Sequence, residues 1–228
     1  IAIDVGDLVA AARLAPLVAN LRDPEVRANA CAAAAEAAIG ALKTLEKDSH
    51  ADVSSILLAL GEKALPTILE ALAEEESMGT RKRLLEVVGR HSTSALPYIR
   101  PLLNDSRWYV VRNAIFLLRR LGDREVAPTL RLMLGRARPQ VIEEILKTLV
   151  AQQDPQWLTA LVRVLDSDDP DRQTVAVRVA SHIHHPQVVR ALVERLRARQ
   201  GGKLREPLTV ELIRAAGRLG APAFLPAL

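Results

Sequence analysis

Apolar residues recur along the whole chain with the i, i+3, i+4 and i+7 spacing of amphipathic α-helices. Segment 105–123 is typical of the pattern. Its predicted buried stripe comprises Val111, Ala114, Ile115, Leu118 and Leu121. Short polar breaks separate such runs, which are each about 10 to 14 residues long. The pattern therefore predicts an all-α fold.

The helical pattern repeats with a fixed period. Proline recurs every 31 residues at Pro66, Pro97 and Pro128, within the similar segments ALPTILEAL, ALPYIRPLL and VAPTLRLML. WLTALVRVL begins at Trp157 and VVRALVERL at Val188, again 31 residues apart. A polar break and a second apolar run follow each of these segments. The repeating unit is therefore predicted to be a helical hairpin.

Residues at the ends of the runs support this division into helices. Each of the three prolines falls in the first turn of a first helix, where a missing N–H costs no intrahelical bond. Aspartates before second helices are expected to cap free N–H groups; they are Asp23, Asp105 and Asp169. Glycines are expected where second helices end; they are Gly40, Gly89, Gly122 and Gly220.

The chain is expected to be a single repeat domain over residues 1–228, built from about seven antiparallel hairpins. The predicted hairpins span residues 7–40, 41–61, 64–90, 95–122, 126–152, 157–184 and 188–220, followed by a truncated eighth at 221–228. Repeat arrays need capping elements for solubility. Flanking domains of the same chain are therefore expected, and they would cover Leu225 and Leu228.

Several segments resemble HEAT repeats, in particular the short bacterial type, also called the PBS-lyase type. They are LPTILEAL and LPYIRPLL in first helices, DPEVRANA and WYVVRNA at the start of second helices, and LRRLGD and GRLGAP at their exits. The resemblance implies an α-solenoid, a superhelix with right-handed stacking, in which second helices line the concave side.

The resemblance has two departures. The 31-residue period is shorter than the roughly 40 to 47 residues of usual HEAT units. The segment VIEE, with Glu143, stands where Arg27 and Arg112 would predict an arginine. Other helical repeats fit worse, because the Trp, Gly and Tyr pattern of tetratricopeptide repeats and the TPLH of ankyrin repeats do not occur.

A second face of the helix near 108–120 is left over once its apolar stripe is assigned. Repeat register extends this face to other second helices as a partly basic ridge, interrupted by Glu143, Glu144 and Glu211. The candidate partner-binding residues are Arg81, Tyr109, Arg112, Phe116, Arg119, Arg120, Lys147, Arg178 and Arg214. Tyr and Arg are among the residue types that dominate protein interfaces.

Charge is unevenly distributed along the chain. Residues 1–90 carry ten Lys and Arg against fourteen Asp and Glu, whereas residues 91–228 carry 21 against 13. The main hypothesis is a non-catalytic scaffold that binds another protein, such as an acidic segment, on its concave face. One alternative is a nucleic-acid-binding module that uses the basic C-terminal half. The other is a solvated face with local i,i+4 ion pairs.

Residues with metal-binding or catalytic chemistry are sparse. The single cysteine, Cys31, lies in an alanine-rich helical run and is expected to be a core residue. His182, His184 and His185 form a cluster of metal-ligand types, but no Cys, Asp or Glu follows at suitable spacing. No P-loop, nucleophile elbow, HExxH or dinucleotide motif occurs. No metal, no cofactor and no enzymatic activity are therefore expected.

Three kinds of HEAT-like enzyme remain as weaker alternatives. HEAT-like hydroxylases carry His-Glu pairs for iron, but Glu follows none of the five histidines. Base-excising enzymes use an aromatic cleft with an acidic residue, which Trp108 or Trp157 with Asp105 or Asp154 matches only loosely. Bilin lyase subunits share the short repeats, and no further residue selects that role.

The chain has no predicted membrane span. Its longest apolar runs fall short of the roughly 20 residues needed to cross a bilayer. No export signal is recognised at its beginning. A cytoplasmic location is therefore expected.

Overall fold

The computed structural model describes residues 7–199 and 206–227, and within them all regular structure is helical. The chain divides into two compact units, Ile1–Asp123 (unit 1) and Arg124–Leu228 (unit 2). Each unit has the layered helix stacking of an α-solenoid, so the predicted fold class is confirmed. The single domain and the right-handed stacking stay predictions.

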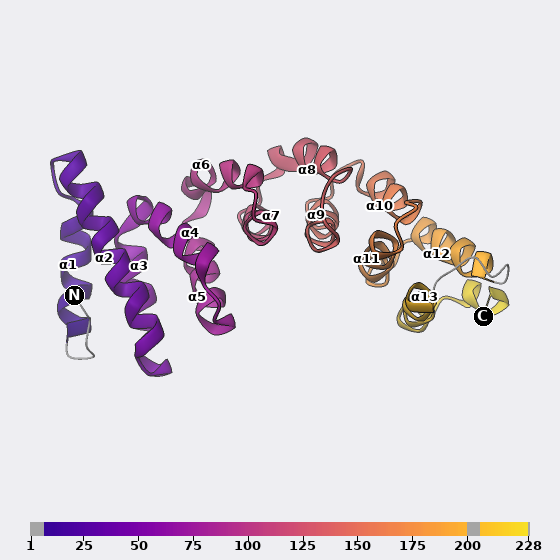
Figure 1. The fold of residues 1–228 in the computed structure, drawn as a ribbon, viewed down its shortest axis with the longest axis horizontal. Helices are drawn as coiled ribbons and strands as arrows, with labels where there is room; N and C mark the ends of the chain where they lie inside the picture. The colour runs from indigo at the N-terminus through magenta and orange to yellow at the C-terminus, as the bar shows by residue number, and fades with distance from the viewer. Residues whose placement is uncertain (1–6, 200–205, 228) are drawn as a thin grey trace. The chain divides into compact units, whose positions relative to one another are not determined.

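Unit 1 is built from two layers of helices (Figure 1). Its helices are α1 (Leu8–Ala19), α2 (Pro24–Thr44), α3 (His50–Ala59), α4 (Leu65–Glu74), α5 (Met78–Val88), α6 (Leu96–Ile99) and α7 (Trp108–Arg120). Helices α2, α4 and α6 pack side by side as a first layer, and α1, α3, α5 and α7 pack as a second layer. The hairpins are therefore α2–α3, α4–α5 and α6–α7.

Unit 2 repeats this plan. Its helices are α8 (Ala127–Met133), α9 (Pro139–Ala151), α10 (Trp157–Leu165), α11 (Pro170–Ala180), α12 (Pro186–Arg199) and α13 (Glu206–Leu219). Helices α9, α11 and α13 pack side by side as the second layer, and α8, α10 and α12 each pack on the second helix of their own hairpin. A 3-10 helix, η7 (Pro222–Ala227), packs on α12 and buries Phe224.

The core lies between the two layers of each unit and is almost entirely aliphatic. In α7 the predicted stripe is buried at Val111, Ala114, Ile115 and Leu118, whereas Leu121 is half-buried. Burial of such side chains contributes on the order of 1.5–3 kcal/mol each. Cys31 is fully buried, as expected, and burial raises the pKa of its thiol.

Two of the second helices end with the same backbone conformation. Gly122 and Gln153, which lie 31 residues apart, both adopt a left-handed conformation, with φ of 72° and 54°. The N–H groups of the following Asp123 and Asp154 donate to carbonyls five residues back, each at 3.0 Å. These contacts have the form of a Schellman motif, which satisfies carbonyls at a helix end.

The two aspartates are also held by arginines from first-layer helical segments. Arg100, in the 3-10 helix η5 (Arg100–Asn104), donates to both carboxylate oxygens of Asp123, at 2.8 and 2.7 Å. Arg131 of α8 forms the equivalent ion pair with Asp154. Because both carboxylates are buried, these pairs fix the exit of each second helix against its first helix.

Most of the predicted helix ends are confirmed. Pro66, Pro97 and Pro128 lie at the start of α4, α6 and α8, and the side chains of Asp23 and Asp169 cap α2 and α11. Asp105 does not cap α7 directly. Its carboxylate accepts from the N–H of Arg107, which is the N-cap residue.

The expected boundary at residue 40 between hairpins 7–40 and 41–61 is wrong. Helix α2 runs without interruption from Pro24 to Thr44, through Gly40, and pairs with α3 as a first-layer helix. The alanine-rich sequence explains this, because alanine has the highest helix propensity and one glycine costs only about 1 kcal/mol. The predicted opening of a truncated eighth hairpin at 221–228 corresponds to η7, and Leu228 lies outside the described residues.

Candidate functional site

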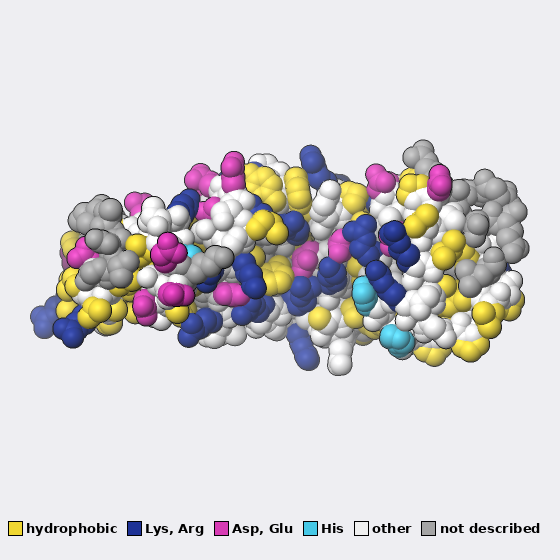
Figure 2. All heavy atoms as spheres, turned by 90° about the horizontal axis from the view of Figure 1, so that it is seen from below, with side chains coloured by type: hydrophobic (Ala, Val, Ile, Leu, Met, Phe, Trp, Pro, Cys, Tyr) yellow, Lys and Arg dark blue, Asp and Glu magenta, His cyan; other side chains and the backbone are white. Residues whose placement is uncertain are grey.

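One side of α7, next to its buried stripe, is partly exposed to solvent. At 100° per residue this side contains six side chains, here called the α7 face. They are Trp108, Tyr109, Arg112, Phe116, Arg119 and Arg120. Tyr109 and Arg120 are exposed and the other four are half-buried. The predicted residues of α7 therefore share one face of the helix. Figure 2 shows many Lys and Arg side chains, in dark blue, among apolar side chains on the face of the molecule that it draws.

Stacking contacts order the α7 face. The rings of Trp108 and Tyr109 meet edge to face with centroids 5.9 Å apart. The guanidinium of Arg112 lies 5.4 Å from the centroid of the Trp108 ring, and that of Arg119 lies 5.4 Å from Phe116. Such cation–π contacts hold an arginine side chain in place over the ring.

The guanidinium groups of Arg112 and Arg120 have no acidic partner among the described residues. Arg112 donates to the side-chain oxygen of Asn113 at 3.2 Å, and no ion pair joins Arg112 or Arg120 to a described carboxylate. Arg120 crosses the end of the neighbouring α5, where a Cβ on Gly89 would lie 2.6 Å from its Nε. Glycine at position 89 therefore makes room for the Arg120 side chain.

The guanidinium of Arg107, just before α7, by contrast has acidic partners. It donates to Asp105 at 3.0 and 2.9 Å and to Glu70 at 3.3 Å. The hydrogen bonds from Arg107 lower the pKa of the Asp105 carboxyl. Asp105 and Asp154, the acids considered for base excision, are thus both bound to arginines.

Arg81 of α5 has a structural contact as well. Its Nη2 donates to the carbonyl of Glu75, the residue that ends α4. This bond ties the end of a first helix to the start of the second helix in the same hairpin. Arg81 belongs to the predicted ridge by register, but this donor is already used within unit 1.

The predicted basic residues of unit 2 are paired with glutamates. Lys147 donates to Glu143 at 2.7 Å, and Arg178 reaches the other oxygen of Glu143 at 3.3 Å. Arg214 donates to Glu211 at 2.8 Å. The Lys147–Glu143 and Arg214–Glu211 pairs match the alternative of local ion pairs, whereas Arg178–Glu143 joins α11 to α9.

Two apolar residues of the second layer of unit 1, Met78 and Trp108, were not among the predicted site residues. Met78 begins α5 and is 78% exposed. It lies 31 residues before Tyr109, so the repeat period contained the signal that could have identified it. Trp108, which the sequence suggested only for the base-excision alternative, contacts Arg112 and so belongs to the α7 face.

The histidine cluster of unit 2 is open. His182 and His184 are exposed, and His185 meets the ring of Trp157 edge to face at 5.5 Å. Among residues 7–199 and 206–227, no group of three or more His, Cys, Asp or Glu is placed to hold a metal ion. Within the same ranges no helix is long and apolar enough to span a membrane.

Comparison with known proteins identifies the repeat type. Residues 65–146 match the family model described as HEAT repeats. The chain is 29% identical over 132 residues to an uncharacterised phycocyanin operon protein Y from Pseudanabaena tenuis (strain PCC 7409). That match covers 54% of this chain and 31% of the relative, so the chain spans about a third of the length of the relative. The predicted resemblance to HEAT repeats is confirmed.

One solved structure, that of an engineered protein, matches 92% of this chain and 96% of its own. Its sequence identity is 15% and its TM-score is 0.45.

Proposed function

We propose that this protein is a non-catalytic protein-interaction module whose α7 face binds an acidic segment of a partner protein. HEAT-type repeats fit a protein-interaction role in general. The acidic partner and the choice of α7 are the specific parts of the proposal. The α7 face lies on the second layer, which the HEAT resemblance assigns to the concave side.

The observation that carries the proposal is that Arg112, which stacks on an aromatic ring of its own helix, has no ion pair with a described carboxylate. Arg112 lies over Trp108, and Tyr109 and Phe116 flank it on the same sector. Arginine and large aromatic side chains are the usual centres of binding energy in interfaces. A carboxylate of a partner would accept hydrogen bonds from the guanidinium of Arg112, and it would lie beside partly buried aromatic rings.

The nucleic-acid alternative has less support. It relies on the basic C-terminal half, yet Lys147, Arg178 and Arg214 are each paired with a glutamate in unit 2. Phosphate binding would have to displace these carboxylates. It would also depend steeply on salt, because each phosphate contact releases counterions.

The test measures retention of proteins and nucleic acids from a lysate of the source cells on immobilised wild type and on Arg112→Glu/Phe116→Ala. The matched control is Arg190→Glu, a charge reversal at an exposed first-layer residue of α12. Retained proteins are identified by mass spectrometry and then re-tested singly by isothermal titration calorimetry.

The proposal expects a protein that binds wild type and the control alike, and binds the double variant at least about tenfold more weakly, a loss of about 1.4 kcal/mol. Equal binding to all three would refute a role for the α7 face. Recovery of nucleic acid that washes off between 50 and 200 mM salt, as expected for several phosphate contacts, would favour the alternative instead.

A further inference from the structure

Unit 1 carries a groove between two consecutive first-layer helices, α2 and α4. It has a volume of about 550 Å³, and its apolar lining includes Ile39 of α2 and Pro66 and Ala71 of α4. Glycine at position 40 keeps it open, because a Cβ on Gly40 would meet no atom within 4 Å. Both helices that form the groove are described along their whole length. The groove is therefore a feature of unit 1 itself.

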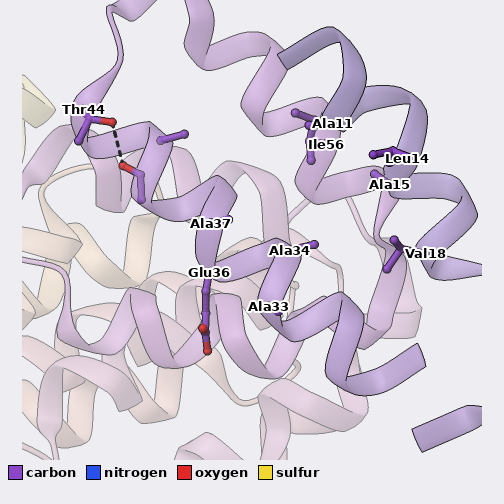
Figure 3. A pocket seen from close by; sticks show the side chains of 12 residues that line it. Ala11, Leu14, Ala15, Val18, Ala33, Ala34, Glu36, Ala37, Thr44 and Ile56 are labelled. Atoms are coloured by element: carbon purple, nitrogen blue, oxygen red, sulfur yellow. Dashed lines mark hydrogen bonds between the residues drawn. The ribbon is translucent and has the colours of Figure 1, made fainter. Parts of the chain in front are cut away.

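The two walls of the groove carry carboxylates. Glu36 lies on α2, and Glu70 and Glu74 lie on α4; all three are exposed. Figure 3 shows the carboxylate of Glu36 on the side of α2 away from Leu14 and Val18 of α1. The groove is therefore acidic on both sides of an apolar floor.

The basic side chains near the groove are already used within unit 1. Lys43, the basic residue of the lining, has its ammonium 3.0 Å from Oε2 of the buried Glu75. Arg107 reaches Glu70 at 3.3 Å, but it also donates two hydrogen bonds to Asp105. No ion pair joins the other two wall glutamates to a basic side chain among the described residues. A complementary charge must therefore come from a ligand.

Glu74 is unfavourable for the helix on which it lies. It follows Glu70 by four residues, so the two like charges repel each other on one face of α4. It also lies in the last turn of α4, where the helix dipole disfavours a negative charge. The last turns of α2, α8 and α10 each carry a basic residue instead. A bound cationic group would relieve both unfavourable contacts of Glu74.

The lining selects the chemistry of the occupant. Lysine and arginine bury an apolar stem while the charged head stays at the surface, so their stems fit over Ile39 and Ala71 with their heads near the wall carboxylates. Glu70 and Glu74 are one turn apart, or about 6 Å along the helix. Alternate residues of an extended chain point to the same side about 6.6 Å apart. Basic residues at alternate positions therefore match the α4 wall.

We propose that the α2–α4 groove binds an extended segment of a partner protein with lysine or arginine at alternate positions. The stems of these residues cover the apolar floor, and their charges meet Glu36 and Glu74. This inference goes beyond the function proposed for the α7 face. The two surfaces share no residue and select opposite charges, so each can fail without the other.

The probe is a labelled synthetic peptide in which lysine alternates with serine, with three lysines in all. One comparison peptide has the same composition with its lysines adjacent, and a second has glutamate in place of each lysine. Binding to the full chain is followed by fluorescence anisotropy at about 50 mM salt, where charge interactions are only weakly screened.

Two groove variants and two matched controls sharpen the test. Glu36→Gln/Glu74→Gln removes two wall charges, and Glu62→Gln/Glu194→Gln removes two exposed charges outside the lining. Ala71→Trp fills the groove, and Ala198→Trp places the same bulk on an exposed position of α12. Circular dichroism melting of every variant verifies its fold and reports its stability.

The expected result is saturable binding of the alternating peptide with a Kd on the order of 100 μM. Each groove variant weakens binding at least about fivefold, and both controls stay within about twofold. The peptide with adjacent lysines binds at least about threefold more weakly, and the glutamate peptide shows no saturation. Glu36→Gln/Glu74→Gln also raises the melting temperature by about 1–2 °C, because it removes the repulsion on α4.

Several results would overturn the proposal. Absence of saturation up to about 1 mM, or equal binding to wild type and Glu36→Gln/Glu74→Gln, would exclude a basic ligand in this groove. Equal binding of the alternating and adjacent peptides would exclude the extended spacing. A lowered melting temperature of Glu36→Gln/Glu74→Gln would show that the carboxylates hold unit 1 together instead. Self-association of wild type that this variant abolishes would make a second copy the occupant.

Discussion

The second layer of unit 1 and that of unit 2 share a repeat register but differ in how their basic residues are used. On α7, Arg112 stacks on Trp108 and has no ion-pair partner among the described carboxylates. On α9 and α11, Lys147 and Arg178 converge on Glu143. The two faces have similar basic content, but Arg112 lacks the ion pair that Lys147 and Arg178 each form with Glu143.

Glutamates one helical turn away produce this difference. Glu143 precedes Lys147 by four residues, and Glu211 precedes Arg214 by three, so each pair is a local one on its own helix. The corresponding position before Phe116 on α7 is Arg112 itself. A ridge deduced from basic residues alone therefore overstates the charge that a ligand would meet in unit 2.

The largest expected effect tests whether the hydrophobic cores of the two units are equivalent. Leu118 and Leu149, which lie 31 residues apart, are both fully buried. Leu118→Ala and Leu149→Ala should each reduce the free energy of unfolding by about 2–5 kcal/mol, because each leaves a cavity. Urea unfolding followed by circular dichroism measures both. A loss below about 1 kcal/mol in either variant would contradict equivalent cores.

The next effect tests the faces themselves. Once a partner is identified, Arg112→Glu/Phe116→Ala should weaken its binding by more than about tenfold, or about 1.4 kcal/mol. Lys147→Glu/Arg178→Glu should change binding less than about threefold, because both side chains already pair with Glu143. Calorimetric titration measures both. A larger loss from the unit 2 variant would reverse the comparison.

A smaller effect concerns the helix exits. Gly122 in unit 1 and Gln153 in unit 2 share the left-handed conformation, which glycine adopts without strain. Gly122→Ala should cost about 1 kcal/mol, and Gln153→Gly should stabilise unit 2 by up to about 1 kcal/mol. Thermal unfolding checks both signs. Destabilisation by Gln153→Gly would mean that contacts of the glutamine side chain outweigh the backbone strain.

The smallest expected effect is a pH dependence specific to unit 1. Burial lowers the pKa of His91, and the nearby Glu62 opposes this shift in part. A histidine with a lowered folded-state pKa stabilises the fold above its unfolded pKa of about 6.5, and that stability is lost as the pH falls below it. His91→Gln should therefore reduce the stability change between pH 7.5 and pH 5. Unfolding curves at both pH values measure it, and an unchanged difference would exclude His91 as its source.

Much of the architecture follows from the sequence itself. The 31-residue period, the prolines at Pro66, Pro97 and Pro128 and the caps at Asp23 and Asp169 identify helices and hairpins, because apolar spacing and end residues act locally. The sequence also predicted that Tyr109, Arg112 and Phe116 share a sector of one helix. Helical periodicity alone determines that arrangement.

Tertiary structure decided the rest, since it depends on which side chains meet across helices. The sequence predicted a helix end at Gly40. In the structure α2 continues to Thr44, because alanine favours the helix, and α2 packs in the first layer. That assignment placed α1 beside α3 in the second layer. Packing also decided which ridge arginines were used internally, as with Arg81 and the carbonyl of Glu75. Such contacts join residues whose spacing in the sequence carries no signal of their approach in space.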